Sequence, residues 1–129
     1  MAIFLGLIGL GLFMNLSFYK TYSFQSEENL VISMLLRARS GAINNINQAK
    51  HGIYMNSPGN YVLFQGDSYA TRDISYDVIM PANSAMSHSG ASEIVFSQLT
   101  GETTSASIVL TDSTHSATIS INSEGGITW

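Results

Sequence analysis

The chain has 129 residues and a formal net charge of −4, a length that suits one compact domain together with one extended helix. It contains no cysteine, which excludes a disulfide framework and a cysteine-based zinc site. No lysine or arginine follows Arg72, so the C-terminal half lacks the clustered basic residues that a nucleic-acid-binding surface requires.

The N-terminal stretch is the most apolar part of the chain. Residues 1–14 have no polar side chain, and the first charge is Lys20. A helix of residues 1–19 would be about 28 Å long, close to the roughly 30 Å of a hydrocarbon core. A membrane helix would bury a series of apolar side chains in lipid: Ile3, Phe4, Leu5, Leu7, Ile8, Leu10, Leu12 and Phe13.

Two other interpretations of this stretch compete with a membrane helix. A secretory signal peptide begins with basic residues and ends at a small-residue cleavage site, and neither is present. A buried core helix of a soluble protein stays open. We favour a membrane helix over residues 1–24, because the sequence that follows continues it as an amphipathic helix.

Residues 25–50 have the spacing of an amphipathic helix. Apolar residues recur every three or four positions and form one stripe that should pack on the rest of the chain: Val31, Leu35, Ala38, Ala42 and Ile46. Glu27, Arg37 and Ser40 are expected to lie largely off it. The helix should end near Lys50, with Gly52 as the stop signal. Ser23 and Ser26, followed by acidic residues, could instead cap a new helix, which leaves a kink open.

Residues 51–129 change to a strand-like period and predict an antiparallel β-domain. Pro58-Gly59 between two short apolar runs is typical of a hairpin. The stretch from Ala82 to Ala91 has no clear period and is expected to be a loop. The fold class is therefore α+β, a long helix packed on an antiparallel sheet or sandwich. The predicted strands are 53–56, 61–65, 73–80, 93–98, 106–111, 117–122 and 127–129.

Three segments together resemble a known family. Residues 30–43 read LVISMLLRARSGAI, residues 93–101 read EIVFSQLTG, and residues 119–129 read ISINSEGGITW. In this order, after an apolar N-terminal helix, they resemble the type IV pilin-like proteins, and most nearly the H-type pseudopilins of type II secretion and the related minor pilins. The resemblance covers nearly the whole chain, although each motif alone is weak.

This resemblance implies a structural role without enzymatic activity, cofactor or metal. The N-terminal helix would hold a single-pass subunit in the cytoplasmic membrane, with the β-domain outside the cytoplasm, and would later pack in the core of a pilus or secretion pseudopilus. The partners would be other pilin or pseudopilin subunits, the lipid bilayer and a prepilin peptidase. The family's leader, cleavage site and early glutamate have no match here, so we hypothesise that Met1 is an internal start.

The remaining polar residues form no sequence signature of a catalytic or metal site. His51, His88 and His115 are scattered and are interpreted as surface histidines. Asp67 and Asp73 with Asp77 could bind calcium, but their spacing is not that of an EF-hand loop. Two alternative functions stay open, a DNA-uptake minor pilin and a membrane-tethered ligand-binding β-domain. The scarcity of basic residues argues against the first.

Overall fold

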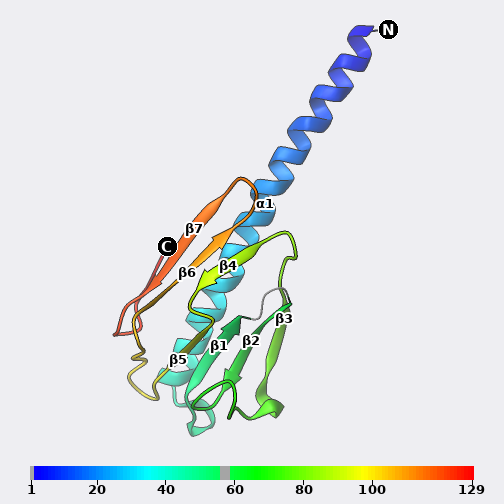
Figure 1. Cartoon of the computed structure of the whole chain (residues 1–129). Helices are drawn as coiled ribbons and strands as arrows, with labels where there is room; N and C mark the ends of the chain where they lie inside the picture. Colours follow the sequence, from blue (N-terminus) through cyan, green and yellow to red (C-terminus); the bar gives the residue numbers. More distant parts are fainter. Residues whose placement is uncertain (1, 56–58) are drawn as a thin grey trace.

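The computed structural model describes the backbone of residues 2–55 and 59–129, and the side chains of residues 22–55 and 59–129. In this part of the chain, one α-helix runs along two four-stranded antiparallel sheets (Figure 1). The α+β class predicted from the sequence is confirmed. The helix is α1 (Ala2–Ile43).

The first three strands belong to one sheet and the last three to the other, whereas the two strands between them alternate between the sheets. The first sheet has the order β3-β2-β1-β5 and the second has the order β4-β6-β7-β8, so β5 returns to the first sheet after β4 has entered the second. The predicted hairpin is confirmed, since the first two strands pair with Ile53 opposite Leu63. The strands are β1 (His51–Met55), β2 (Asn60–Gln65), β3 (Val78–Pro81), β4 (Ser87–Gly90), β5 (Glu93–Phe96), β6 (Ala106–Thr111), β7 (Ser116–Ile121) and β8 (Ile127–Thr128).

One hydrophobic core joins the helix to both sheets. Val31, Leu35, Ala38 and Ala42 of the predicted stripe are each 0 % exposed and belong to this core. Both sheets contribute alternate side chains to it, as expected of sheets with one buried face. The sheet residues in the core include Ile53, Met55, Tyr61, Leu63, Ile94, Phe96, Ile108, Leu110, Ile119 and Ile121.

The predicted end of the helix near Lys50 is wrong. α1 ends at Ile43, and Asn45 then takes a left-handed conformation with φ of 51°. Asparagine adopts this conformation more readily than most residues, so Asn45 ends the helix before the predicted stop at Gly52 is reached. Ile46 therefore starts a short 3₁₀ helix, η1 (Ile46–Gln48), and is 48 % exposed rather than packed on a sheet. The alternative helix start at Ser23 or Ser26 is also wrong, because α1 continues through both.

Two predictions about the middle of the chain need correction. The predicted strand 73–80 begins with a 3₁₀ helix, η2 (Ile74–Tyr76), because the Asp73 side chain accepts a hydrogen bond from the Ser75 backbone amide at 3.0 Å. Ile74 is consequently 71 % exposed, and pairing starts only at Val78. The predicted loop 82–91 contains β4, which pairs with β6 although its small polar residues show no strand period.

The residues predicted to face lipid lie outside the described side chains. These residues are Ile3, Phe4, Leu5, Leu7, Ile8, Leu10, Leu12 and Phe13, and no contact is assigned to them. Within the described residues, no helical segment combines the length and the apolar character needed to cross a bilayer.

Candidate functional site

A buried polar cluster joins α1 to the β-domain near the first described turns of the helix. Glu27 is only 7 % exposed, and its carboxylate accepts a hydrogen bond from the Asn83 backbone amide at 3.1 Å. The Asn83 side chain donates to the Ser23 hydroxyl at 2.8 Å. The Tyr61 hydroxyl of β2 also bonds Glu27. We call Ser23, Glu27, Tyr61 and Asn83 the junction cluster.

The junction cluster keeps the Tyr61 phenol protonated. Burial raises the pKa of Tyr61 well above its ordinary value, and the hydrogen bond and negative charge of Glu27 raise it further. The phenol therefore remains a donor to the carboxylate at all physiological pH values. Each polar group in the cluster thus has a partner, which is the condition for burying such groups at low cost.

A second contact holds the same part of the helix from the other sheet. The ring of Phe24 stacks on the imidazole of His115, with 5.1 Å between the ring centroids. His115 lies at the turn between β6 and β7, where its Nδ1 is 3.1 Å from the Asp112 carboxylate. α1 is therefore held within residues 23–27 by both sheets, and these contacts fix its direction relative to the β-domain.

The sequence prediction missed the junction cluster, although one signal was present. Glu27 is four residues before Val31 and continues the buried stripe toward the N-terminus. The prediction that Glu27 lies largely off the stripe is wrong, because its side chain is buried and its carboxylate accepts from the Asn83 amide. Its partners, the buried Tyr61 and the partly buried Asn83, lie far away in the sequence, and only the fold brings them together.

The three aspartates weighed as calcium ligands have separate partners. Asp67 lies 3.8 Å from Lys50, Asp73 caps η2, and Asp77 pairs with Arg72 at 2.8 Å. Among the described residues, no group of three or more His, Asp or Glu side chains is placed to hold a metal ion.

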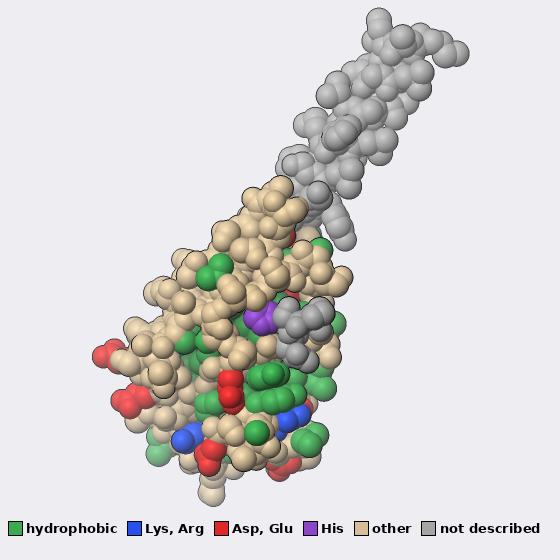
Figure 2. Space-filling view, viewed as in Figure 1, with side chains coloured by type: hydrophobic (Ala, Val, Ile, Leu, Met, Phe, Trp, Pro, Cys, Tyr) green, Lys and Arg blue, Asp and Glu red, His purple; other side chains and the backbone are tan. Residues whose placement is uncertain are grey.

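The basic residues that follow α1 are paired with carboxylates. The Arg72 guanidinium bonds Asp77 and lies over the ring of Tyr69, 3.7 Å from its centroid. Lys50 lies beside Asp67. On the face shown in Figure 2, basic side chains lie next to acidic ones and form no extended patch. This arrangement gives no support to the DNA-uptake alternative, which needs unpaired cations that can contact phosphates.

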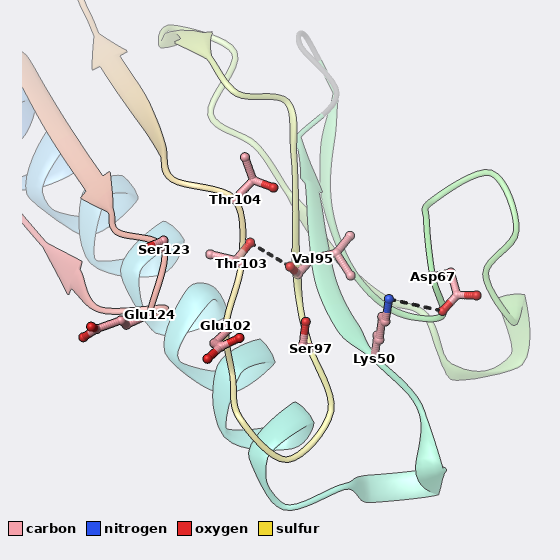
Figure 3. A pocket seen from close by; sticks show the side chains of 9 residues that line it. All are labelled: Lys50, Asp67, Val95, Ser97, Glu102, Thr103, Thr104, Ser123 and Glu124. Atoms are coloured by element: carbon pink, nitrogen blue, oxygen red, sulfur yellow. Dashed lines mark hydrogen bonds and ion pairs between the residues drawn. The ribbon is translucent and has the colours of Figure 1, made fainter.

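A polar cavity of about 550 Å³ opens beside β5, and we call it the β5 pocket. Figure 3 shows Lys50 and Asp67 on one side of Val95, and Glu102 with Glu124 on the other. The Thr103 hydroxyl donates to the Val95 carbonyl at 2.7 Å and thereby satisfies one backbone acceptor of β5. Among the residues that the structure describes, no histidine lines this pocket.

His51 is buried between α1 and the first sheet, so its interpretation as a surface histidine is wrong. It is 5 % exposed, and its ring lies against Gly41, where an added Cβ would be 2.8 Å from Cδ2. Nδ1 lies 2.9 Å from the Ala49 carbonyl, an acceptor, so Nδ1 carries the proton of the neutral ring. Nε2 is then a bare acceptor, and it has no partner among the described residues.

Acid should destabilise the fold through His51. Burial lowers the pKa of His51 below its ordinary value of 6.5, and the hydrogen bond to Ala49 offsets part of this. The unfolded chain therefore binds a proton more readily than the folded one. The stabilisation by neutral His51 is complete above pH 6.5 and is lost as the pH falls toward the lower folded pKa, by at most about 1.4 kcal/mol per pH unit.

Urea unfolding of the full chain in detergent, measured at a series of pH values, checks this prediction. His51→Gln should remove this part of the pH dependence, whereas His88→Gln, in β4, should retain it. Equal pH profiles for wild type and His51→Gln would contradict the assignment.

Comparison with known proteins finds no relative of this chain, since no family model, curated protein or solved structure matches it.

Proposed function

We propose that this chain is a structural subunit of a type IV pilus or a type II secretion pseudopilus, and that it serves as a minor subunit. One observation carries the proposal. α1 begins at Ala2, and its N-terminal part extends beyond both sheets of the β-domain in Figure 1. The sequence before Lys20 has no charged side chain and is mostly apolar, which suits a helix whose first part binds something other than its own domain.

Two environments would cover that part of the helix in turn. In the cytoplasmic membrane, lipid surrounds its apolar side chains, and in the filament other subunits' helices replace the lipid. Each Leu, Ile or Phe kept from water contributes roughly 1.5–3 kcal/mol in either environment, so the exchange costs little. Gly6, Gly9 and Gly11 would permit close approach of neighbouring helices.

The β-domain would lie outside the cytoplasm and contact neighbouring subunits. The junction cluster supports this role, because a subunit that carries load through its helix needs a fixed joint between helix and domain. A prepilin peptidase would be a further partner where a leader precedes the sequence. No cofactor is part of the proposal.

The absence of cysteine from the sequence allows a direct test. Leu10→Cys and Ser113→Cys each introduce a single thiol, one in the apolar stretch and one in the exposed turn between β6 and β7. In the cells that produce the protein, the chain should stay in the membrane pellet after alkaline extraction. A membrane-impermeant maleimide should label Ser113→Cys in spheroplasts and leave Leu10→Cys unlabelled.

Filament membership is tested separately. The chain should appear in the sheared, sedimentable filament fraction of wild-type cells and disappear from it when the assembly ATPase is deleted. Release by alkaline extraction, together with labelling of Leu10→Cys, would refute the membrane step. A chain that remains in the membrane but never enters the sheared fraction would refute filament assembly.

A further inference from the structure

Two loops of the β-domain lie beside α1 at the point where the helix leaves the domain (Figure 1). One is formed by residues 82–86 between β3 and β4, and the other is the turn of residues 112–115 between β6 and β7. The first loop bonds Ser23 at 2.8 Å through a side-chain amide, and the second stacks its imidazole on Phe24 with 5.1 Å between the ring centroids. We call these two loops the helix-exit surface, and both lie at the same level along α1.

The sequence relates this level to the end of the apolar stretch. Lys20, the first charged residue, is only a few positions before Ser23 and Phe24. At 1.5 Å per residue, these two residues lie about 4.5–6 Å beyond Lys20 along the helix axis. The headgroup layer on each side of a hydrocarbon core is about 5–7 Å thick. If residues 1–19 occupy the core, as the proposed function requires, the helix-exit surface lies at the level of the headgroups.

The helix-exit surface presents no free carboxylate to such a layer. Its one acidic residue is Asp112, which is 13 % exposed and accepts hydrogen bonds from two backbone amides of its own turn. The exposed residues of the surface are small and uncharged, and they are Ser84, Ala85, Ser113 and Thr114. Serine and threonine hydroxyls can donate to phosphate oxygens. The surface therefore suits a layer of anionic phosphates.

Exposed acidic side chains are concentrated toward the other end of the β-domain. Glu124 belongs to the turn between β7 and β8, where Gly125 lies against Arg39 of α1. Arg39 is about 22 Å beyond Phe24 along the helix axis. Glu102 lines the β5 pocket together with Glu124, so it lies at the same end. Figure 2 shows most charged side chains of the visible face in the half of the domain remote from the N-terminal part of α1.

This distribution of charge favours one orientation on a membrane. Phospholipid phosphates are negative, and the chain carries a net charge of −4. Repulsion is weakest when the exposed carboxylates point away from the lipid. Tyr22 of α1 is 72 % exposed just before the contacts of the helix-exit surface, and tyrosine is enriched where a bilayer meets water.

We propose that the helix-exit surface rests on the phospholipid headgroups of the membrane that holds α1. The hydroxyls of Ser84, Ser113 and Thr114 contact the phosphate layer, and Tyr22 lies at its inner boundary. This contact rests on the proposed function, and it holds the β-domain in one orientation on the membrane before assembly. The headgroup layer is hydrated, so a thiol at residue 113 still reacts with a water-soluble maleimide.

Fluorescence quenching by lipids tests this contact. The full chain is reconstituted into vesicles of phosphatidylethanolamine and phosphatidylglycerol that contain a lipid with a nitroxide on its headgroup. Since the sequence has no cysteine, Ser84→Cys and Ser113→Cys each carry a single bimane fluorophore at the helix-exit surface. Both should lose most of their fluorescence to the nitroxide. Ser123→Cys, at an exposed position in the turn between β7 and β8, is the matched control and should keep its fluorescence.

A fourth variant separates this inference from the proposed function. Leu10→Cys carries the same fluorophore, and a lipid with a nitroxide on its acyl chain should quench it. Quenching at residue 10 without quenching at residues 84 and 113 would overturn the headgroup contact and leave membrane insertion in place. No quenching at residue 10 would overturn both. Equal quenching at residues 84, 113 and 123 would mean that the β-domain has no fixed orientation, which would also overturn the proposal.

Discussion

Replacement of Leu35 by alanine should lower the free energy of unfolding by about 2–5 kcal/mol. Leu35 is 0 % exposed and lies in the core that joins α1 to both sheets. The substitution removes buried methyl groups and leaves a cavity that the surrounding helix and strands can close only in part. Urea unfolding of the full chain in detergent, followed by circular dichroism, measures the change.

The neighbouring residue supplies a matched control for this prediction. Leu36 has the same side chain on the same helix but is 47 % exposed. Leu36→Ala should therefore cost less than about 1 kcal/mol. Equal losses at the two positions would show that helix propensity, rather than burial against the sheets, dominates the stability of this part of α1.

Replacement of Glu27 by alanine should cost about 2–4 kcal/mol, because it leaves buried donors of the junction cluster without an acceptor. The Asn83 amide and the Tyr61 hydroxyl lose their partner in the same step. Glu27→Gln keeps a carbonyl acceptor in the same place, so its cost should be smaller. Denaturant unfolding of the full chain measures both variants, and hydrogen exchange at the Asn83 amide reports directly on the cluster.

Glu28 is the control for Glu27, since it is the next residue on the helix and is only partly buried. Glu28→Ala should change the free energy of unfolding by less than about 0.5 kcal/mol. A Glu27→Ala variant as stable as Glu28→Ala would mean that water replaces the carboxylate, and that the cluster does not fix the helix.

The elements with strong periodicity were predictable from the sequence. The stripe at Val31, Leu35, Ala38 and Ala42 lies in the core, and the alternation in residues 117–121 places Ile119 and Ile121 in the core as well. In these segments, local pattern and tertiary packing agree, so spacing alone identifies the buried face. The antiparallel pairing of β1 with β2 was predictable from the turn residues in the sequence between them.

The errors occurred where a local interaction or a distant partner overrides the pattern. Asn45 ends the helix although the apolar spacing continues to Ile46, and Asp73 caps a 3₁₀ turn within an apparently alternating stretch. The strand Ser87–Gly90 exists because β6 pairs with it, and its own residues predict a loop. The candidate sites follow the same logic, because the partners of Glu27 and the walls around His51 are set by the fold.

The contacts of both sheets with residues 23–27 of α1 have a mechanical consequence. Tension applied along the helix reaches the first sheet through Glu27 and Tyr61, and it reaches the second sheet through Phe24 and His115. The two contacts thus share the force, and neither sheet has to bear all of it. Tension on α1 can therefore be borne without prior unfolding of the β-domain.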